Sequence, residues 1–258
     1  MTIARNIPRL QLSLALATLL LLGGPTGLLA QEVEWGYEGE TGPEHWAALD
    51  PEFQTCATGL EQSPVDIPAG APVRADDVAY DYQPSALTIA DNGHAIQVDY
   101  DEGSGITIGD GTYALRQFHF HSPSEHTVDG EAADMELHLV HQDEAGALAV
   151  VGVLLVEGAA NPALEPIWAH LPDAPGPATL IEGPIIDADD LLPADRSSYG
   201  YPGSLTTPPC LEGVTWHVLA ESVELSAEQL ATFREIHDGT NRPVQALNER
   251  SFEDADGG

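Results

Sequence analysis

The chain has 258 residues, and its 42 acidic side chains outnumber 8 basic ones, which gives a formal net charge of -34. All eight basic residues are arginines. This balance excludes a nucleic-acid-binding protein, because phosphate contacts need a basic surface, and it argues equally against docking on anionic lipid. Hydrophobic residues still make up 43% of the chain, so we expect one globular domain with a sizeable core.

The acidic residues are distributed in ones and twos, as in Asp76-Asp77 and Asp189-Asp190. We therefore expect an evenly acidic folded surface of the halophilic type, suited to high salt because dissolved ions screen the self-repulsion. Cation or mineral binding by this surface is the alternative. Only residues 251–258 have the character of an acidic tail.

The first thirty residues differ from the rest. Two arginines precede an apolar run over residues 10–22, a Gly-Gly-Pro sequence interrupts it, and the small residue Ala30 offers a cleavage point. The run is too short to span a bilayer comfortably. The pattern predicts a signal peptide over residues 1–30 and a domain over residues 31–258. We expect an exported protein, periplasmic or extracellular, without stable membrane insertion after cleavage; an uncleaved anchor is the alternative.

Cys56 and Cys210 are the only cysteines. An oxidising compartment outside the cytoplasm favours a disulfide between them. In the chain-entropy model a bond closing so long a loop stabilises the fold by about 5 kcal/mol. Two unpaired buried thiols are the alternative, and nothing in the spacing indicates a cysteine metal site.

Between these ends most of the chain has the alternating or β-rich composition of strands. The expected strands cover residues 87–89, 96–100, 105–108, 115–121, 135–141, 147–156 and 214–219. The run over residues 148–156 is apolar on both faces and is expected at the centre of a sheet. The chain is therefore predicted to have a mainly β (α+β) fold.

Two helices are expected. One begins at Asn161-Pro162 and ends at Pro172. The other begins at Ser226, carries Gln229 in the position of a capping box, and ends at Gly239.

The residues with the clearest chemistry are histidines on two predicted strands. His119 and His121 project from the same face about 7 Å apart, so they can converge on one ion with His138 of the second strand. Three neutral imidazoles suit catalytic zinc, which keeps a fourth position for water. Gln117 and Glu136 share faces with these histidines and can accept their ring N–H groups. By itself, His-x-His in a chain with ten histidines is weak evidence for a metal site, and polar residues on a strand face are the alternative.

Several other segments point to one family. They are Trp35-Gly36-Tyr37, Gly42-Pro43-Glu44-His45-Trp46, Gln62-Ser63-Pro64-Val65-Asp66-Ile67, Asn92-Gly93-His94, Ser122-Pro123-Ser124-Glu125-His126-Thr127, Tyr201-Pro202-Gly203-Ser204-Leu205-Thr206-Thr207-Pro208-Pro209-Cys210 and Arg242-Pro243-Val244-Gln245. Together with the histidine motif, and in this order over essentially the whole chain after the leader, they closely resemble the α-class carbonic anhydrases.

The resemblance implies a single domain around a large central, mostly antiparallel twisted sheet with a few short peripheral helices. It implies reversible hydration of carbon dioxide to bicarbonate and a proton, by attack of a zinc-bound hydroxide, with no organic cofactor. The zinc ligands would be His119, His121 and His138, held by Gln117 and Glu136.

The resemblance also assigns further roles. Thr206 would accept a hydrogen bond from the hydroxide and donate to Glu125, and Thr207 would help to place the substrate. His94 would shuttle the proton, since its ordinary pKa near 6.5 suits transfer at neutral pH. The carbon dioxide pocket would consist of Val140, Val150, Leu205 and Trp216, and the water path of Tyr37, Asn92 and Gln97, the last at a position where Asn is frequent. Cys56 and Cys210 match the disulfide of secreted members.

Two other functions remain open on the sequence. A cupin-type metal enzyme also uses His-x-His followed by Glu, which His119, His121 and Glu125 match, but its later glycine-rich motif is missing. A non-enzymatic acidic binding module on a carbonic anhydrase fold is the other, although retention of all three histidines argues against it. No pattern indicates the oligomeric state.

Overall fold

The computed structural model describes residues 33–75 and 77–252. The expected leader over residues 1–30 and most of the acidic tail lie outside the described residues, so these two predictions stay predictions. Within the described part, no helix has both the length and the apolar character needed to cross a membrane.

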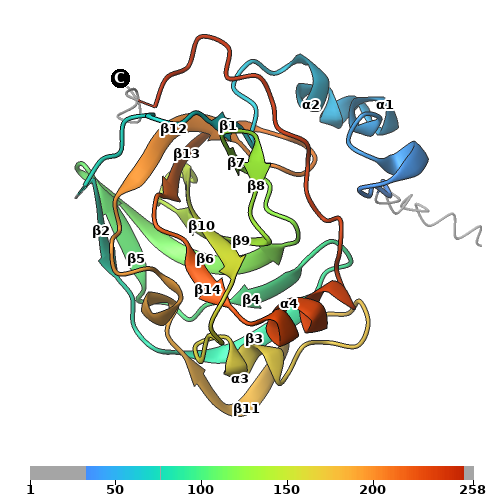
Figure 1. Ribbon diagram of the computed structural model, residues 1–258. Helices are drawn as coiled ribbons and strands as arrows, with labels where there is room; N and C mark the ends of the chain where they lie inside the picture. The colour runs from blue at the N-terminus through green and yellow to red at the C-terminus, as the bar shows by residue number, and fades with distance from the viewer. Residues whose placement is uncertain (1–32, 76, 253–258) are drawn as a thin grey trace, which may run out of the picture. The chain divides into compact units, whose positions relative to one another are not determined.

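A twisted eleven-stranded sheet forms the centre of the fold (Figure 1). Its main path runs in the order β11-β3-β4-β6-β9-β10-β13-β12, with β14 beside β10 and with β5 joining β2 to β6. The strands are β2 (Val78–Asp81), β3 (Ser85–Asp91), β4 (Ile96–Asp99), β5 (Gly105–Ile108), β6 (Gly111–His121), β9 (Met135–Gln142), β10 (Leu148–Glu157), β11 (Thr179–Ile186), β12 (Ser198–Ser204), β13 (Glu212–Leu219) and β14 (Val223–Leu225). A separate small sheet joins β1 (Asp66–Ile67), β7 (Thr127–Val128) and β8 (Glu131–Ala132).

Strand β10 occupies the middle of the large sheet, as its two apolar faces predicted. It pairs antiparallel with β9 and parallel with β13 and β14, whereas the other pairings of this sheet are antiparallel. Val150 of β10 lies between Val140 of β9 and Trp216 of β13. The predicted mainly β fold with a mostly antiparallel sheet is confirmed.

The helices are short and peripheral, as expected. They are α1 (Trp46–Leu49), α2 (Thr55–Thr58), α3 (Glu165–Trp168) and α4 (Ala227–Arg234), and three 3₁₀ turns cover Gly39–Thr41, Pro51–Phe53 and Ala188–Leu191. Figure 1 shows α3 and α4 next to each other beside the sheet.

The capping box predicted for the second helix is present at the start of α4. Ser226 Oγ accepts from the N–H of Gln229, and the Gln229 side chain accepts from the N–H of Ser226. The helix ends at Arg234, before Gly239. The first helix is shorter than predicted, because Asn161 Oδ1 accepts from the N–H of Ala163 and so forms a turn ahead of α3.

Two long strands, β11 and β12, were not predicted from the sequence. Strand β11 contains a register shift between Ile181 and Ile185, and the intervening Gly183-Pro184 is typical of a turn. Strand β12 contains Gly200, Pro202 and Gly203. Both strands end the path of the sheet, and edge positions tolerate the proline and glycine that a central strand excludes.

The two faces of β6 separate core from site. Phe118 and Phe120 are fully buried in the main hydrophobic cluster, together with Leu137 and Leu139 of β9. Phe233 of α4 packs on the same cluster, with its ring 6.0 Å from that of Phe120. The alternate residues of β6 point to the opposite face, so burial of the phenylalanines fixes the direction of the histidines.

Cys56 and Cys210 form the predicted disulfide. It joins α2 to the segment that follows β12. Because the N–H of Cys210 donates to the carbonyl of Thr207, the disulfide also supports the Thr206-Thr207 segment.

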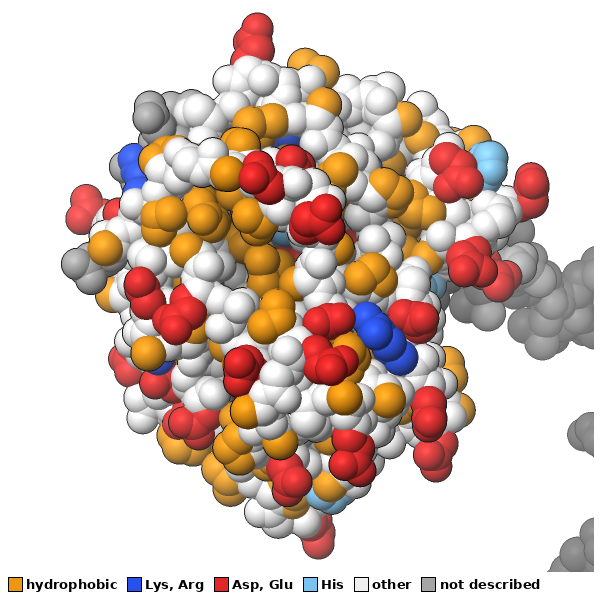
Figure 2. All heavy atoms as spheres, in the orientation of Figure 1, with side chains coloured by type: hydrophobic (Ala, Val, Ile, Leu, Met, Phe, Trp, Pro, Cys, Tyr) orange, Lys and Arg blue, Asp and Glu red, His pale blue; other side chains and the backbone are white. Residues whose placement is uncertain are grey.

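The surface carries acidic side chains in many separate places. Figure 2 shows them scattered over one face of the molecule, with few basic groups between them. This distribution fits the expectation of an evenly acidic surface rather than one acidic patch.

Candidate metal centre

His119, His121 and His138 come together on one face of the paired strands β6 and β9. His119 lies directly opposite His138 in the register, and His121 lies opposite Glu136. One ring nitrogen from each histidine falls within 4.8 Å of the others. The alternation of the two strands thus produces the cluster that the sequence predicted.

Each of these rings uses its other nitrogen on an oxygen atom of the protein. Nδ1 of His119 lies 2.8 Å from Gln117 Oε1, and Nε2 of His138 lies 2.9 Å from Glu136 Oε1. Nδ1 of His121 lies 2.6 Å from the carbonyl oxygen of Thr240. The contacts of Gln117 and Glu136 follow the strand periodicity, whereas a backbone carbonyl more than a hundred residues away leaves no signal in the sequence.

The surroundings keep two of the rings neutral. Burial lowers the pKa of His119 well below its ordinary value, and the neighbouring His121 and His138 lower it further. Burial also lowers the pKa of His121, although the Glu125 carboxylate raises it in part. Neutral imidazole is the form that binds a metal ion. His121 Nε2 is buried and has no hydrogen-bond partner.

Glu136 anchors a second group of side chains behind the first. Burial raises its pKa, but His126 and His138 outweigh that effect and hold the pKa well below its ordinary value. Its Oε2 accepts the N–H groups of Glu125 and His126, and its Oε1 lies 2.7 Å from His126 Nδ1. His126, Glu136 and His138 also lie close enough to hold an ion. Because the carboxylate oxygens already have protein donors, we assign this group to positioning.

Thr206 and Glu125 are both buried, and Glu125 contacts the histidines. Glu125 Oε1 accepts from the N–H of Arg242, while Oε2 lies 3.6 Å from His121 Nε2 and has no hydrogen-bond partner. Among the described residues no hydrogen bond joins Thr206 to Glu125. One acceptor oxygen of the buried carboxylate therefore stays available.

A cavity of about 140 Å³ lies over the histidines. It is lined by Trp35, Tyr37, Asn92, His94, Ala95, Gln97, Gln117, His119, His121 and Thr207. All the residues predicted for the water path line it. The Tyr37 hydroxyl is buried without a hydrogen-bond partner, and Asn92 Nδ2 donates to Gln97 Oε1 at 3.4 Å.

His94 lies at this cavity with its ring stacked on Trp35. The ring centroids are 3.6 Å apart and the planes differ by 9°. Burial lowers the pKa of His94, His237 lowers it further, and Asp91 raises it. The sequence motif placed His94 here, but it did not indicate Trp35 as its stacking partner.

The four predicted pocket residues form part of the second hydrophobic cluster. Val150 and Trp216 are buried members, and Val140 and Leu205 pack against them while partly exposed. The Trp216 ring lies 4.9 Å from that of His138. An apolar surface therefore adjoins the histidine cluster.

Comparison with known proteins matches this fold and site to one family. The model of the eukaryotic-type carbonic anhydrases matches residues 41–254. The chain belongs to the α-class carbonic anhydrase family. It is 45% identical to a carbonic anhydrase of Nostoc sp., over 86% of each chain. It is 40% identical to a carbonic anhydrase of Neisseria gonorrhoeae, over 95% of this chain and 96% of the relative.

A solved structure agrees with these relatives. The α-carbonic anhydrase of Thermovibrio ammonificans, in complex with the inhibitor sulfanilamide, superposes with a TM-score of 0.81 at 43% identity, covering 86% of this chain and 99% of that one. The protein is therefore an enzyme of the carbonic anhydrase type, a family of metalloenzymes that act on carbon dioxide and bicarbonate. The cupin-type alternative is wrong.

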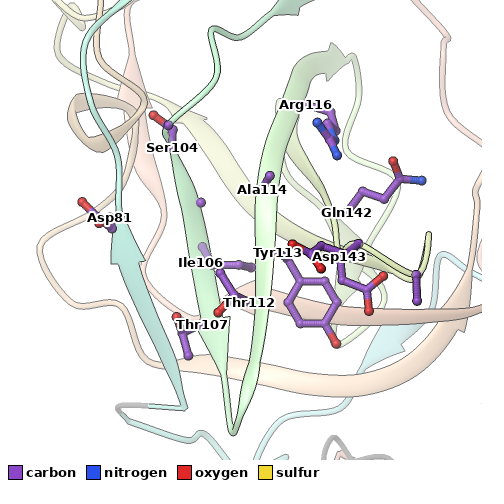
Figure 3. A pocket seen from close by; sticks show the side chains of 14 residues that line it. Asp81, Ser104, Ile106, Thr107, Thr112, Tyr113, Ala114, Arg116, Gln142 and Asp143 are labelled. Atoms are coloured by element: carbon purple, nitrogen blue, oxygen red, sulfur yellow. The ribbon is translucent and has the colours of Figure 1, made fainter.

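A larger cavity of this carbonic anhydrase lies away from the histidines. It has a volume of about 660 Å³, and Figure 3 shows its side chains rising from β5, β6 and the segment after β9. Arg116, Gln142 and Asp143 border it. No histidine lines it, and no cluster of metal-binding side chains occurs there within the described part. Size alone therefore does not mark the active site.

Proposed function

We propose that this protein catalyses the reversible hydration of carbon dioxide with a zinc ion held by His119, His121 and His138. The observation that carries the proposal is the set of contacts made by the ring nitrogens of these three histidines. In each ring one nitrogen lies within 3 Å of a protein oxygen atom. One nitrogen from each ring lies within 4.8 Å of the others.

The donor set fits zinc. Three imidazoles, with buried and unpartnered His121 Nε2 among them, correspond to the three protein ligands of a catalytic zinc site. When bound, zinc supplies a Lewis acid that lowers the pKa of a water molecule to about 7. Gln117, Glu136 and the Thr240 carbonyl fix the tautomers and directions of the three rings.

Thr206 and Glu125 orient the nucleophile. The Glu125 carboxylate is held by the N–H of Arg242, and its free Oε2 is an acceptor for a hydroxyl donor. If the Thr206 hydroxyl donates its hydrogen to Glu125 Oε2, its oxygen can only accept a hydrogen bond from the nucleophile. The nucleophile must then point its own hydrogen at Thr206, which fixes its orientation. Thr207, which lines the cavity, contacts the substrate.

The apolar surface beside His138 holds carbon dioxide. Carbon dioxide is small and uncharged, so Val140, Val150, Leu205 and Trp216 can bind it without an ionic partner. Bicarbonate is charged and leaves such a surface more readily, which favours product release.

The proton leaves through the cavity to His94. Tyr37, Asn92 and Gln97 offer hydroxyl and amide groups along its wall, and ordered water between them can carry the proton. His94 accepts it at the cavity and passes it to buffer, because imidazole changes charge near neutral pH.

The protein acts outside the cytoplasm, in the periplasm or extracellular space. The Cys56–Cys210 disulfide suits an oxidising compartment, and the leader sequence accounts for export. The acidic surface suits a saline setting, since screening by salt removes its self-repulsion.

Replacement of one ligand tests the proposal. His119→Ala is expected to abolish tight zinc binding and carbon dioxide hydration, because two histidines cannot hold a catalytic zinc ion. Metal analysis and stopped-flow hydration measure both. His45→Ala, at a partly exposed histidine outside the site, serves as the control and should behave like the wild type. A fully active, metal-free His119→Ala protein would contradict the proposal, and so would a zinc-loaded wild type without hydration activity.

A further inference from the structure

A buried hydrogen bond joins the segment after α4 to the turn that carries His94. His237 Nε2 lies 3.0 Å from Asp91 Oδ1. Asp91 is 2% exposed and His237 is 9% exposed. Neither residue lines the cavity over the histidine cluster, and neither belongs to the family motifs described above.

Asp91 connects His237 to the turn. The same Oδ1 atom accepts the N–H of Gly93 at 2.8 Å. The carbonyl of Asp91 accepts the N–H of Gly176, so Asp91 is fixed on both its backbone and its side chain. Gly93 has a φ of 88°, which other residues rarely adopt, so this conformation depends on its local contacts.

Asn92 completes the turn. Its Oδ1 accepts the N–H groups of His94 and Ala95, both at 2.9 Å. The backbone that carries the His94 ring is therefore held by two carbonyl-type oxygens, one from Asn92 and one from Asp91. Of these two, only the Asp91 oxygen is held in turn by a distant part of the chain.

The segment that supplies His237 also contacts the metal centre. Thr240, three residues further on, places its carbonyl 2.6 Å from His121 Nδ1. Its N–H donates to the carbonyl of Ser122. Residues 237–240 therefore hold both the turn of His94 and the ring of one proposed zinc ligand.

We infer that His237 is a positioning residue for proton transfer, which orients the His94 turn through the carboxylate of Asp91. This inference rests on the proposed function. Without the His237 ring, a nearly buried carboxylate loses a donor and turns toward water, because a buried charge without partners is costly. Gly93 then loses its acceptor, and the His94 ring samples positions away from the cavity.

The expected effect is confined to one part of the reaction. His237 contacts no residue of the carbon dioxide surface in the described part of the chain, so hydration itself should not change. Proton transfer to buffer depends on the His94 position, so it should slow. In steady-state terms kcat falls when buffer is dilute, whereas kcat/KM stays the same.

The test compares His237→Ala, His237→Gln, His94→Ala and the matched control His170→Ala in stopped-flow hydration. His170 is partly buried, and its Nδ1 contacts the carbonyl oxygen of Pro166, whereas His237 contacts the turn that carries His94. In dilute buffer His237→Ala should lose about tenfold in kcat, less than the roughly hundredfold that a lost proton-transfer group typically costs. Added imidazole should restore it. His237→Gln, which keeps an N–H donor, should recover much of the loss, and His170→Ala should match the wild type.

Amide hydrogen exchange provides a readout independent of activity. The Gly93 amide should exchange about tenfold faster in His237→Ala, because its acceptor is no longer fixed. If His237→Ala does not fold, Asp91→Asn keeps the shape of the acceptor while removing its charge, and it should show the same changes to a smaller degree.

Three results would overturn the inference. They are an unchanged kcat in dilute buffer, an unchanged Gly93 exchange rate, or an equal fall of kcat and kcat/KM with loss of zinc, which would indicate a general structural role through Thr240. If the wild type itself does not hydrate carbon dioxide, the proposed function fails, and the exchange rate of Gly93 still decides whether His237 holds the turn.

Discussion

Two groups of buried histidines differ in how their ring nitrogens are used. In the metal centre, each ring of His119, His121 and His138 has one nitrogen close to a protein oxygen atom. One nitrogen from each of the three rings lies within 4.8 Å of the others. Outside it, His126 has Nδ1 2.7 Å from Glu136 and Nε2 2.6 Å from the Tyr201 hydroxyl. His141 has Nε2 2.8 Å from the Tyr82 hydroxyl and Nδ1 3.3 Å from the Ala149 carbonyl.

The difference shows that burial does not identify a metal ligand, since His126 and His141 are at least as buried as His119. The two groups differ in whether a ring nitrogen is left without a protein partner and can therefore bind a metal ion. His126 and His141 have both nitrogens in contact with groups of the fold, so the loss of either should cost stability. A ligand histidine has one nitrogen free for the ion, so its loss should cost metal.

The largest effect that tests this distinction is expected for His126→Ala. The change removes the imidazole that contacts both Glu136 Oε1 and the Tyr201 hydroxyl, two buried groups. The free energy of unfolding should therefore fall by about 4 kcal/mol. The three ligand nitrogens remain, so zinc should still bind, with affinity weakened by at most about a hundredfold through Glu136. Urea unfolding and metal analysis measure the two quantities.

His45→Ala, at a partly exposed residue, is the control and should change stability by less than about 0.5 kcal/mol. A His126→Ala protein that keeps its stability but loses zinc would erase the distinction between the two groups.

A smaller effect is expected in the pH dependence of stability through His141. Burial lowers its pKa to about 3, although hydrogen bonds of the ring with the backbone of Ala149 and Leu139, such as that to the Ala149 carbonyl, raise it in part. Between the ordinary pKa of about 6.5 and pH 3 the unfolded chain binds a proton that the folded protein does not bind. The stability from neutral His141 is therefore fully present above pH 6.5 and decreases as the pH falls.

Between pH 6.5 and pH 4 this residue should account for a decrease of about 3 kcal/mol. His141→Gln cannot bind the proton, so the difference in stability between wild type and variant should shrink as the pH falls. Urea unfolding across this pH range measures it. Parallel curves would show that His141 titrates normally in the fold.

The smallest effect concerns the acidic surface, which acts on the site only at a distance. A negative field favours the protonated forms of groups in the site, and salt screens that field. The pH midpoint of hydration should therefore fall by about half a unit from dilute buffer to molar salt, with activity retained. Two different sodium salts separate screening from binding of the anion at the metal. A midpoint independent of salt would show that the surface charge does not reach the site.

Much of the site could be predicted because it lies on two strands with strict alternation. Phe118 and Phe120 alternate with His119 and His121 along β6, so burial of the phenylalanines on one face directs the histidines to the other. The positions of Gln117 and Glu136 follow from the same periodicity. The resemblance to the family supplied the residues on loops, such as Thr206 and His94, for which local patterns give no direction.

Other parts of the site could not be predicted, because they depend on contacts between distant segments. The Thr240 carbonyl beside His121 is a backbone group with no residue type attached to it. The stacking of Trp35 on His94 and the hydrogen bond of Asp91 with His237 join segments whose sequences show no shared pattern. Strands β11 and β12 were missed because their glycine and proline residues indicate turns, and only the edge of a sheet accommodates them.

The central claim is that the cluster of His119, His121 and His138 holds the zinc ion that hydrates carbon dioxide. Stopped-flow hydration by the full-length protein, before chelation, after removal of metal and after return of one equivalent of zinc, tests it most directly. We expect activity that is lost with the metal and restored by zinc. Undiminished hydration by the metal-free protein, or none by the zinc-loaded protein, would contradict the account.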